Sequence, residues 1–394
     1  MTTNPKISIF ILLASATLTV MAGAIIAPVL NLIRDGVGVE ASAARIIITT
    51  HSIFVAIFSP VFGIIIDRIG PKRPYIFGLA LYGIAGGAGL FVTDYWVLLA
   101  VRALLGIGVA GIMTSITVLI FDLYNQGEER NKIMGWRASS QSVGGIVWPL
   151  LGGFLGTFSW HFPFAVYLIG IPMGLFVLLF IPEQNRKLSI NKIVREKSVF
   201  VIFRENISLL IPYGIVFLSS VFLYSIVVFL PNVLENLGII SSFKVGLFIS
   251  GTSLMSAVSA FMYVKIRAHL SYRTIVILGL AFWIIGFTTL SQVSSIWLIG
   301  ISLAFFGIGG GMMMPVAQLW AGELVPASFR GRITSYLGSF GLGGQFLSPI
   351  ILSPIASSFS LNSVFLVISI VNVILLLAFL TVLRGITVKT DYLI

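Results

Sequence analysis

The stretch Gly63-Ile64-Ile65-Ile66-Asp67-Arg68-Ile69-Gly70-Pro71-Lys72-Arg73 decides the fold of this chain. Its charges lie between two long apolar segments, in a chain of which only 9% of the residues are charged. A short charged group between two segments of about twenty apolar residues is typical of a turn at a membrane surface. The stretch therefore predicts a membrane protein with a tight polar loop between two spanning helices.

The composition of the whole chain leads to the same class of protein. Hydrophobic residues make up 58% of its 394 residues, and the mean hydropathy is +1.07. A soluble domain cannot bury that much apolar surface. The chain has no cysteine, and its histidines, His51, His161 and His269, lie far apart. We therefore expect no metal and no cofactor. The sequence has no recognisable nucleophile–base pair and no phosphate-binding glycine loop, so we do not expect an enzyme.

Twelve apolar runs are long enough to cross a bilayer, which needs about twenty residues. The runs are continuous rather than alternating, which excludes a β-barrel. We therefore expect an all-α polytopic membrane protein with twelve transmembrane helices. The runs cover residues 8–32, 42–66, 74–92, 96–121, 134–158, 162–182, 208–231, 243–264, 273–291, 295–321, 333–357 and 362–383.

Lysine and arginine collect on one side of this predicted topology. Twelve spans place both termini on the same side, and most of the 24 basic residues fall there, including Arg137. The positive-inside rule then predicts that both termini are cytoplasmic, in the cytoplasmic membrane of a microbe. The same bias explains the net charge of +11 without a nucleic-acid partner.

The sequence repeats itself at an offset of about 200 residues, a spacing that predicts two related halves of one transporter. The matching positions are Gly106-Ile107-Gly108 with Gly307-Ile308-Gly309, Asp122-Leu123 with Glu323-Leu324, Arg130-Asn131-Lys132 with Arg330-Gly331-Arg332, Gly144 with Gly344, Pro149 with Pro349, and Arg73 with Arg273. We expect two pseudo-symmetric six-helix bundles at 1–182 and 207–394, joined by a basic cytoplasmic linker at 183–206. Two such halves favour alternating access to a central site.

The charged loop resembles the signature of the major facilitator superfamily, Gly-x-x-x-Asp-Arg-x-Gly-x-Arg/Lys-Arg/Lys, which lies between helices two and three in that family. The resemblance implies a transporter whose inward gate is held closed by charge pairs between helix ends. We expect Asp122 and Glu323 to pair with loop arginines such as Arg68, Arg130 or Arg330, with ordinary interfacial charges as the alternative. The predicted gate residues are Gly63, Asp67, Arg68, Gly70, Lys72, Arg73, Asp122, Glu323 and Arg330.

Arg102 is a charged residue inside the fourth predicted span, where an arginine is costly and normally functional. Arg102-x-x-x-Gly106-x-Gly108 resembles the family's second motif, in which this arginine is tied to proton coupling. We expect a coupling group of Arg102, an outer acid (Glu40 or Asp35) and His51, since histidine takes up protons near neutral pH. The alternatives are a structural pair of Arg102 with one of these acids, and a neutral, hydrogen-bonding His51.

The fifth span carries a segment that resembles the family's antiporter motif, Gly-x-x-x-Gly-Pro-x-x-Gly-Gly, which accompanies export. Its residues here are Gly144, Trp148, Pro149, Gly152 and Gly153, with the tryptophan in place of a glycine. Small residues also allow close helix contact, so packing is the alternative role. Polar or adaptable side chains of the inner spans are expected to line a substrate cavity: Gln141, Trp148, Tyr224, Met313, Met314, Gln318 and Gln345.

Together these features predict proton-coupled export, by antiport, of small amphipathic compounds. Proton-coupled uptake of a small anion or metabolite is one alternative, and a non-transporting membrane sensor on the same fold is another. The first and seventh spans have no central carboxylate, which argues against a cation-selective pocket. From the resemblance we expect a monomer in the lipid bilayer, with a small molecule and protons as its partners.

Overall fold

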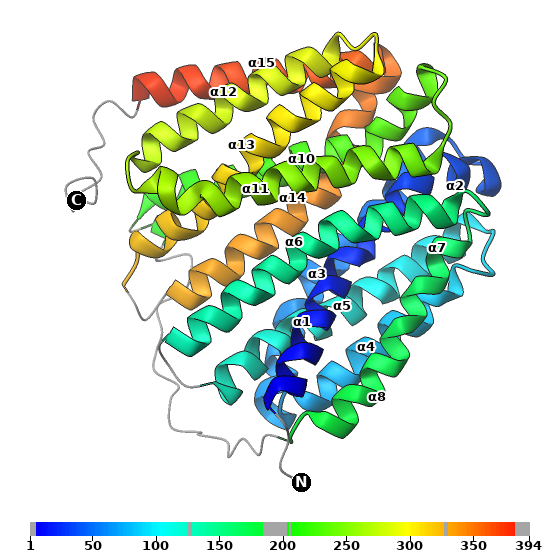
Figure 1. The fold of residues 1–394 in the computed structure, drawn as a ribbon, viewed down its shortest axis with the longest axis vertical. Coiled ribbons are helices and arrows are strands. Elements are labelled where there is room, and N and C mark those ends of the chain that lie inside the picture. Colours follow the sequence, from blue (N-terminus) through cyan, green and yellow to red (C-terminus); the bar gives the residue numbers. More distant parts are fainter. Residues whose placement is uncertain (1–4, 125–127, 184–202, 205, 327–329, 383–394) are drawn as a thin grey trace. The chain divides into compact units, whose positions relative to one another are not determined.

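The computed structural model describes residues 5–124, 128–183, 203–204, 206–326 and 330–382, and these residues fold into helices joined by short turns (Figure 1). The chain divides into two compact units. Unit 1 comprises Met1–Lys197 and Ser241–Ser250, and unit 2 comprises Ser198–Ile240 and Gly251–Ile394. The predicted linker at 183–206 lies almost wholly outside the described residues.

Unit 1 begins with a broken span, which consists of α1 (Pro5–Ala24), the 3₁₀ turn η1 (Ala27–Val29) and α2 (Leu30–Val37). Four long helices follow: α3 (Ala41–Ile69), α4 (Lys72–Ala88), α5 (Tyr95–Leu123) and α6 (Glu128–Gly156). The unit's last span consists of α7 (Phe162–Ala165), η2 (Val166–Ile169) and α8 (Gly170–Phe180).

Unit 2 begins with η3 (Ile207–Leu209) and α10 (Leu210–Asn236). The next helix, α11 (Ser242–Arg267), contributes its first residues to unit 1 and the rest to unit 2. The remaining helices are α12 (Tyr272–Ser291), α13 (Ile296–Glu323), α14 (Arg330–Ser358) and α15 (Leu361–Val382).

The length and composition of these segments confirm the predicted fold class. Within the described part of the chain, 10 segments are long and apolar enough to cross a membrane. The other two spans are α4, which has only 17 residues, and α6, whose first turns carry charged residues. The chain is therefore an all-α polytopic membrane protein with 12 helical spans in its described residues.

The two units repeat one packing scheme, as the sequence repeat predicts. In unit 1, α1 packs against α6, and α4 packs against α5 and α8. In unit 2, the helices six spans later make the same pairs: α10 with α14, and α12 with α13 and α15. The first turn of the third span of each unit also contacts the end of its last span. Lys72 Nζ donates to the carbonyl of Leu178 (2.9 Å), and Arg273 donates to the carbonyl of Leu380 (3.4 Å).

The first span differs from its prediction, because residues 8–32 are not one helix. Helix α1 ends at Ala24, and a 3₁₀ turn that contains Pro28 follows. Proline has no N–H to donate to the carbonyl four residues earlier, so the α-helical ladder is interrupted there. The carbonyls of the last turn of α1 are consequently left for other donors.

Glycines allow the closest helix contacts of unit 1. A Cβ atom added to Gly78 of α4 would lie 2.8 Å from the carbonyl oxygen of Gly108 in α5, and one added to Gly108 would lie 2.8 Å from the Gly78 oxygen. Two helices whose backbones approach this closely have no room for a side chain at either position. The packing of α4 on α5 thus depends on both glycines.

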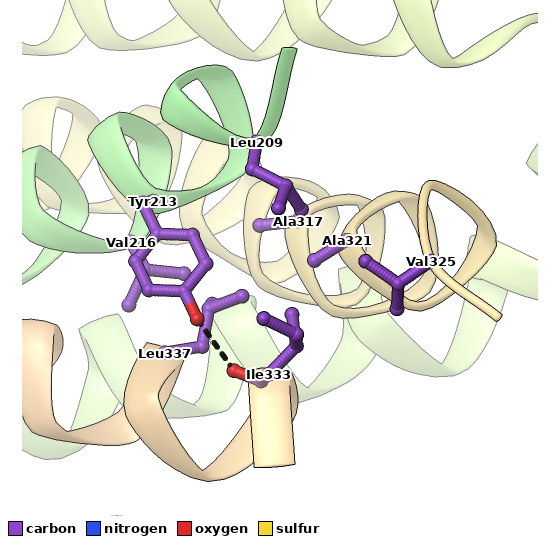
Figure 2. Packing of buried hydrophobic residues seen from close by; sticks show 8 residues of the cluster. All are labelled: Leu209, Tyr213, Val216, Ala317, Ala321, Val325, Ile333 and Leu337. Atoms are coloured by element: carbon purple, nitrogen blue, oxygen red, sulfur yellow. Dashed lines mark hydrogen bonds between the residues drawn. The ribbon is translucent and has the colours of Figure 1, made fainter. Parts of the chain in front are cut away.

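Unit 2 has a compact hydrophobic cluster where η3, the start of α10, the end of α13 and the start of α14 meet (Figure 2). Tyr213 lies in it, and its hydroxyl donates to the carbonyl of Ile333 at 2.7 Å. The buried members are Leu209, Tyr213, Val216, Ala317, Ala321, Val325, Ile333 and Leu337. The cluster fastens the first turn of α14 to α10 and α13.

Candidate functional site

A buried polar cluster forms around Arg102 of α5, a residue only 1% exposed. Its Nε donates to the carbonyl of Ile47 (3.1 Å), and one terminal nitrogen donates to the hydroxyl of Tyr167 (3.1 Å). The other terminal nitrogen donates to the carbonyls of Ala22 and Ile48. Every nitrogen of this guanidinium therefore has an acceptor, and the acceptors come from three other elements.

The break in the first span explains why an arginine fits there. Ala22 lies in the last turn of α1, where helix carbonyls have no partner within the helix. The hydroxyl of Tyr167 also donates to the Ala22 carbonyl, at 2.8 Å. Arg102 and Tyr167 thus both donate to the carbonyl of Ala22 at the end of α1. These hydrogen bonds connect α1 to α3, α5 and η2. The cost of burying the arginine is offset by carbonyl dipoles rather than by an acid.

His51 lies in this cluster, and its Nδ1 is within hydrogen-bonding distance of both an acceptor and a donor. Its Nδ1 is 2.7 Å from the carbonyl oxygen of Ile48, which requires an N–H on that nitrogen. The same Nδ1 is 3.1 Å from a terminal nitrogen of Arg102, which is always a donor and requires a lone pair. A doubly protonated imidazole offers no lone pair to Arg102. Protonation of His51 and its acceptance of this hydrogen bond are therefore mutually exclusive.

The expected acids are not among the partners of Arg102 in the described residues. Asp35 pairs with Arg34 of its own helix, with 2.7 Å between Nε and Oδ1. Glu40 precedes α3, and its carboxylate is 3.5 Å from the hydroxyl of Ser42. Of the predicted coupling group, the structure brings together Arg102 and His51, and it places neither acid with them.

The loop between α3 and α4 has the features expected of a tight turn. Gly70 ends α3 with φ = 80°, a conformation that side-chain-bearing residues rarely adopt. Arg73 forms an ion pair with Glu183 (3.0 Å). Arg68 is exposed, and a Cβ at Gly63 would meet open space. Asp67 lies in the last turn of α3, so the loop charges stand together at one end of unit 1.

The other predicted gate residues lie at helix ends, close to the following contacts. Arg130, after the end of α5, donates to the carbonyls of Phe121 and Tyr124, next to Asp122. In unit 2, Glu323 accepts a hydrogen bond from the hydroxyl of Tyr272 at 2.6 Å. Arg330 is the first residue of α14, and its side chain lies outside the described residues.

The antiporter-like segment of α6 packs against the first span. A Cβ at Gly144 would lie 3.2 Å from the carbonyl oxygen of Thr17, and one at Gly152 would collide with the carbonyl of Ile25. Trp148 Nε1 donates to the Thr17 carbonyl at 3.0 Å. The tryptophan that replaces the expected glycine therefore fastens α6 to α1.

Two further residues of the segment and one of the predicted cavity residues also lie in unit 1. Pro149 is inside α6. A Cβ at Gly153 would lie 2.6 Å from the carbonyl oxygen of Ser242, within the part of α11 that belongs to unit 1. Gln141 donates to the hydroxyl of Thr19 in α1, at 3.2 Å.

The predicted cavity residues of unit 2 have different environments. Met313 is 1% exposed and packs on Gly279 of α12, so helix packing accounts for its side chain. Met314 packs against the cluster of Figure 2. Gln318 is exposed, and Tyr224 and Gln345 are partly buried.

Arg137 was not selected from the sequence, where it counted as a charge of the cytoplasmic side. The structure places it within α6, with one terminal nitrogen donating to the hydroxyl of Thr117 (2.7 Å). Its Nε is buried and has no hydrogen-bond partner among the described residues. The signal was available, since the apolar run predicted at 134–158 contains residue 137. Tyr167 and Tyr82, which donate to carbonyls of α1, had no comparable signal.

Repeated six-span units with a buried arginine are typical of a membrane transporter. The profile of the Major Facilitator Superfamily matches residues 12–231 and 213–391, so the chain belongs to this superfamily. Members of this superfamily are transporters, and the chain is accordingly a secondary transporter.

Relatives with named functions align over most of the chain. The bacillibactin exporter of Bacillus subtilis (strain 168) is 25% identical over 362 residues, which cover 88% of this chain and 90% of the exporter. The multi-drug resistance efflux pump PmrA of Streptococcus pneumoniae serotype 4 is 25% identical over 342 residues, 84% of each chain. The crystal structure of a D-xylose-proton symporter has a TM-score of 0.79 at 16% identity and covers 95% of this chain and 97% of its own. The last similarity shows the fold alone.

Proposed function

We propose that this protein exports small amphipathic compounds in exchange for protons, by alternating access, as a monomer in the cytoplasmic membrane with both termini inside the cell. The observation that carries the proposal is the contact of the antiporter-like segment of α6 with the first span. Gly144 and Gly152 bring α6 against the backbone of that span, and Trp148 donates to one of its carbonyls. Relatives named as an exporter and an efflux pump support the direction.

Coupling to protons follows from the two neighbours of His51. While Arg102 donates to Nδ1, at 3.1 Å, the imidazole is neutral. If Arg102 withdraws, the lone pair of Nδ1 is free to take up a proton, which it donates to the carbonyl of Ile48, 2.7 Å away, while Nε2 keeps the proton that it already carries. A movement of α5 relative to α3 would therefore load or release a proton. No other imidazole lies within a described spanning helix.

Transport into inside-out vesicles tests the direction. An acidic lumen is imposed, and accumulation of lipophilic cations, neutral drugs and small organic anions is followed in turn. The proposal predicts accumulation of at least one class, abolished by a protonophore, in vesicles with the protein and not in vesicles without it. Accumulation that occurs only in right-side-out vesicles would contradict export and support the alternative, uptake of a small anion or metabolite.

A further inference from the structure

We propose that Arg137, with the hydroxyls of Tyr75 and Ser15 nearby, forms an anion-binding site within unit 1 that takes the carboxylate of an amphipathic compound. The assignment of this ligand as a transported substrate rests on the proposed function. The binding site itself rests only on the geometry of unit 1, so the two can fail separately.

Arg102 and Arg137, two arginines within spans of unit 1, differ in how far the protein satisfies their nitrogens. Every nitrogen of Arg102 already donates to an acceptor of the protein. Arg137, in contrast, makes its hydrogen bond to Thr117 through a single nitrogen, and its Nε is buried without a partner. Leaving a buried charged donor unpaired is costly, unless a ligand supplies the missing acceptor.

The surroundings of Arg137 contain further polar atoms without partners. The hydroxyl of Tyr75 in α4 and that of Ser15 in α1 are both buried, and in the described residues neither has a hydrogen-bond partner other than the hydroxyl of the other. Tyr75 interacts electrostatically with Arg137 and lies close to Ser15. Three helices of unit 1 thus direct polar groups to one region, where the two hydroxyls have at most each other as partners and the Nε of Arg137 has none among the described residues.

A fourth unpaired atom lies on the neighbouring face of α5. The hydroxyl of Ser115 is buried without a partner. Gly108 and Gly111 on this helix contact Gly78 and Pro74 of α4, and Ser115 lies one turn beyond Gly111 on the same face. This face leads to the start of α4, where Tyr75 lies.

The chemistry of these groups selects an anion. The guanidinium is positive, and the hydroxyls are able to donate as well as accept. The neighbour that interacts electrostatically with Arg137 is Tyr75, a neutral phenol, rather than a carboxylate. A carboxylate ligand would accept from the arginine in the geometry that gives the strongest hydrogen bonds, whereas a cation would meet an uncompensated positive charge. An apolar compound that carries a carboxylate group therefore fits both the site and its location in the membrane.

Binding of benzoate, with benzyl alcohol as its uncharged counterpart, tests the site in the purified full-length protein in detergent. Binding is followed by equilibrium dialysis of each radiolabelled compound, because Lys132 Nζ lies 5.1 Å from the centre of the Trp136 ring and its replacement would change the fluorescence of that tryptophan. We expect wild type to bind benzoate and not benzyl alcohol, and Arg137→Gln to weaken benzoate binding about tenfold or more. Lys132→Gln is the matched control, since it removes a positive charge from the same helix at an exposed position, and it should bind benzoate as wild type does.

Equal binding of benzoate and benzyl alcohol by wild type would overturn the proposal, and this comparison needs no variant. Equal benzoate binding by Arg137→Gln and Lys132→Gln would also overturn it. Elution from size-exclusion chromatography shows whether each variant is folded, and Arg137→Lys replaces an unfolded Arg137→Gln. Loss of benzoate binding together with normal vesicle transport of neutral compounds would support the site and separate it from export. Binding without any transport would leave the site standing and refute the proposed function.

Discussion

The hydroxyl of Tyr167 provides the sharpest energetic test of the buried cluster. It accepts from Arg102 (3.1 Å) and donates to the carbonyl of Ala22 (2.8 Å). In Tyr167→Phe, Ala22 keeps Arg102 as a donor, but one nitrogen of the guanidinium loses its acceptor. A hydrogen bond to a charged group contributes about 1.5–3 kcal/mol and a neutral one about 1 kcal/mol. We therefore expect a loss of about 2–4 kcal/mol in the free energy of unfolding.

Tyr82→Phe is the matched control within the same unit. Tyr82 is as fully buried as Tyr167, and its hydroxyl donates to another carbonyl of α1, that of Leu18, at 2.9 Å. Only a neutral bond is lost there, which costs about 1 kcal/mol, and the Leu18 carbonyl lies inside α1, where it keeps its helical partner.

The free energies are measured by titrating the purified protein from mild detergent into denaturing detergent, with tryptophan fluorescence as the signal. The absence of cysteine excludes thiol-reactive dyes for this purpose. If Tyr167→Phe costs no more than Tyr82→Phe, the phenol of Tyr167 does not support the charge of Arg102, and the reasoning about the cluster is refuted.

Three further changes follow from packing and hydrogen bonding. Gly108→Ala would place a Cβ atom 2.8 Å from the Gly78 oxygen and should cost about 1–3 kcal/mol in the same titration; a stability equal to wild type would contradict the close contact. Gly214→Ala, a helical glycine with nothing within 4 Å of the added Cβ, should instead gain up to about 1 kcal/mol. Trp148→Phe removes the donor to the Thr17 carbonyl and should cost about 1 kcal/mol, which an unchanged midpoint would refute.

Much of the fold follows from hydropathy and spacing, because a bilayer requires a fixed length of apolar helix. The twelve spans were predictable on that ground, whereas the repeat was inferred from matching residues such as Gly106 and Gly307. The break in the first span was not, although Pro28 lies within the predicted run. Hydropathy does not show the helix break that a proline causes. The break is seen only in the structure, where Arg102 and Tyr167 donate to the carbonyl of Ala22.

The candidate site was predictable in part. Arg102 is recognisable as a charge inside a span, but its partners are backbone carbonyls, which every residue has and which no sequence pattern marks. The acid partner expected from the sequence is not among the hydrogen-bond partners of Arg102 in the described residues, which are carbonyls, the hydroxyl of Tyr167 and His51. Met313 shows a second limit, since its burial against Gly279 depends on the rotation of α13, which its apolar sequence does not define. Arg137 shows a third, because its position near the start of a run made it resemble a loop charge.

The most direct test of the proposed coupling is the movement of protons in energised inside-out vesicles when a transported compound is added. Wild type is compared with His51→Asn, which offers Arg102 an acceptor near the position of Nδ1 and cannot take up a proton. The control is Ser59→Ala, which removes a hydroxyl of the same helix that donates to the carbonyl of Val55. The account predicts release of protons from the lumen with wild type and Ser59→Ala, and none with His51→Asn even though the protein is folded. Proton release by His51→Asn equal to wild type would contradict the account.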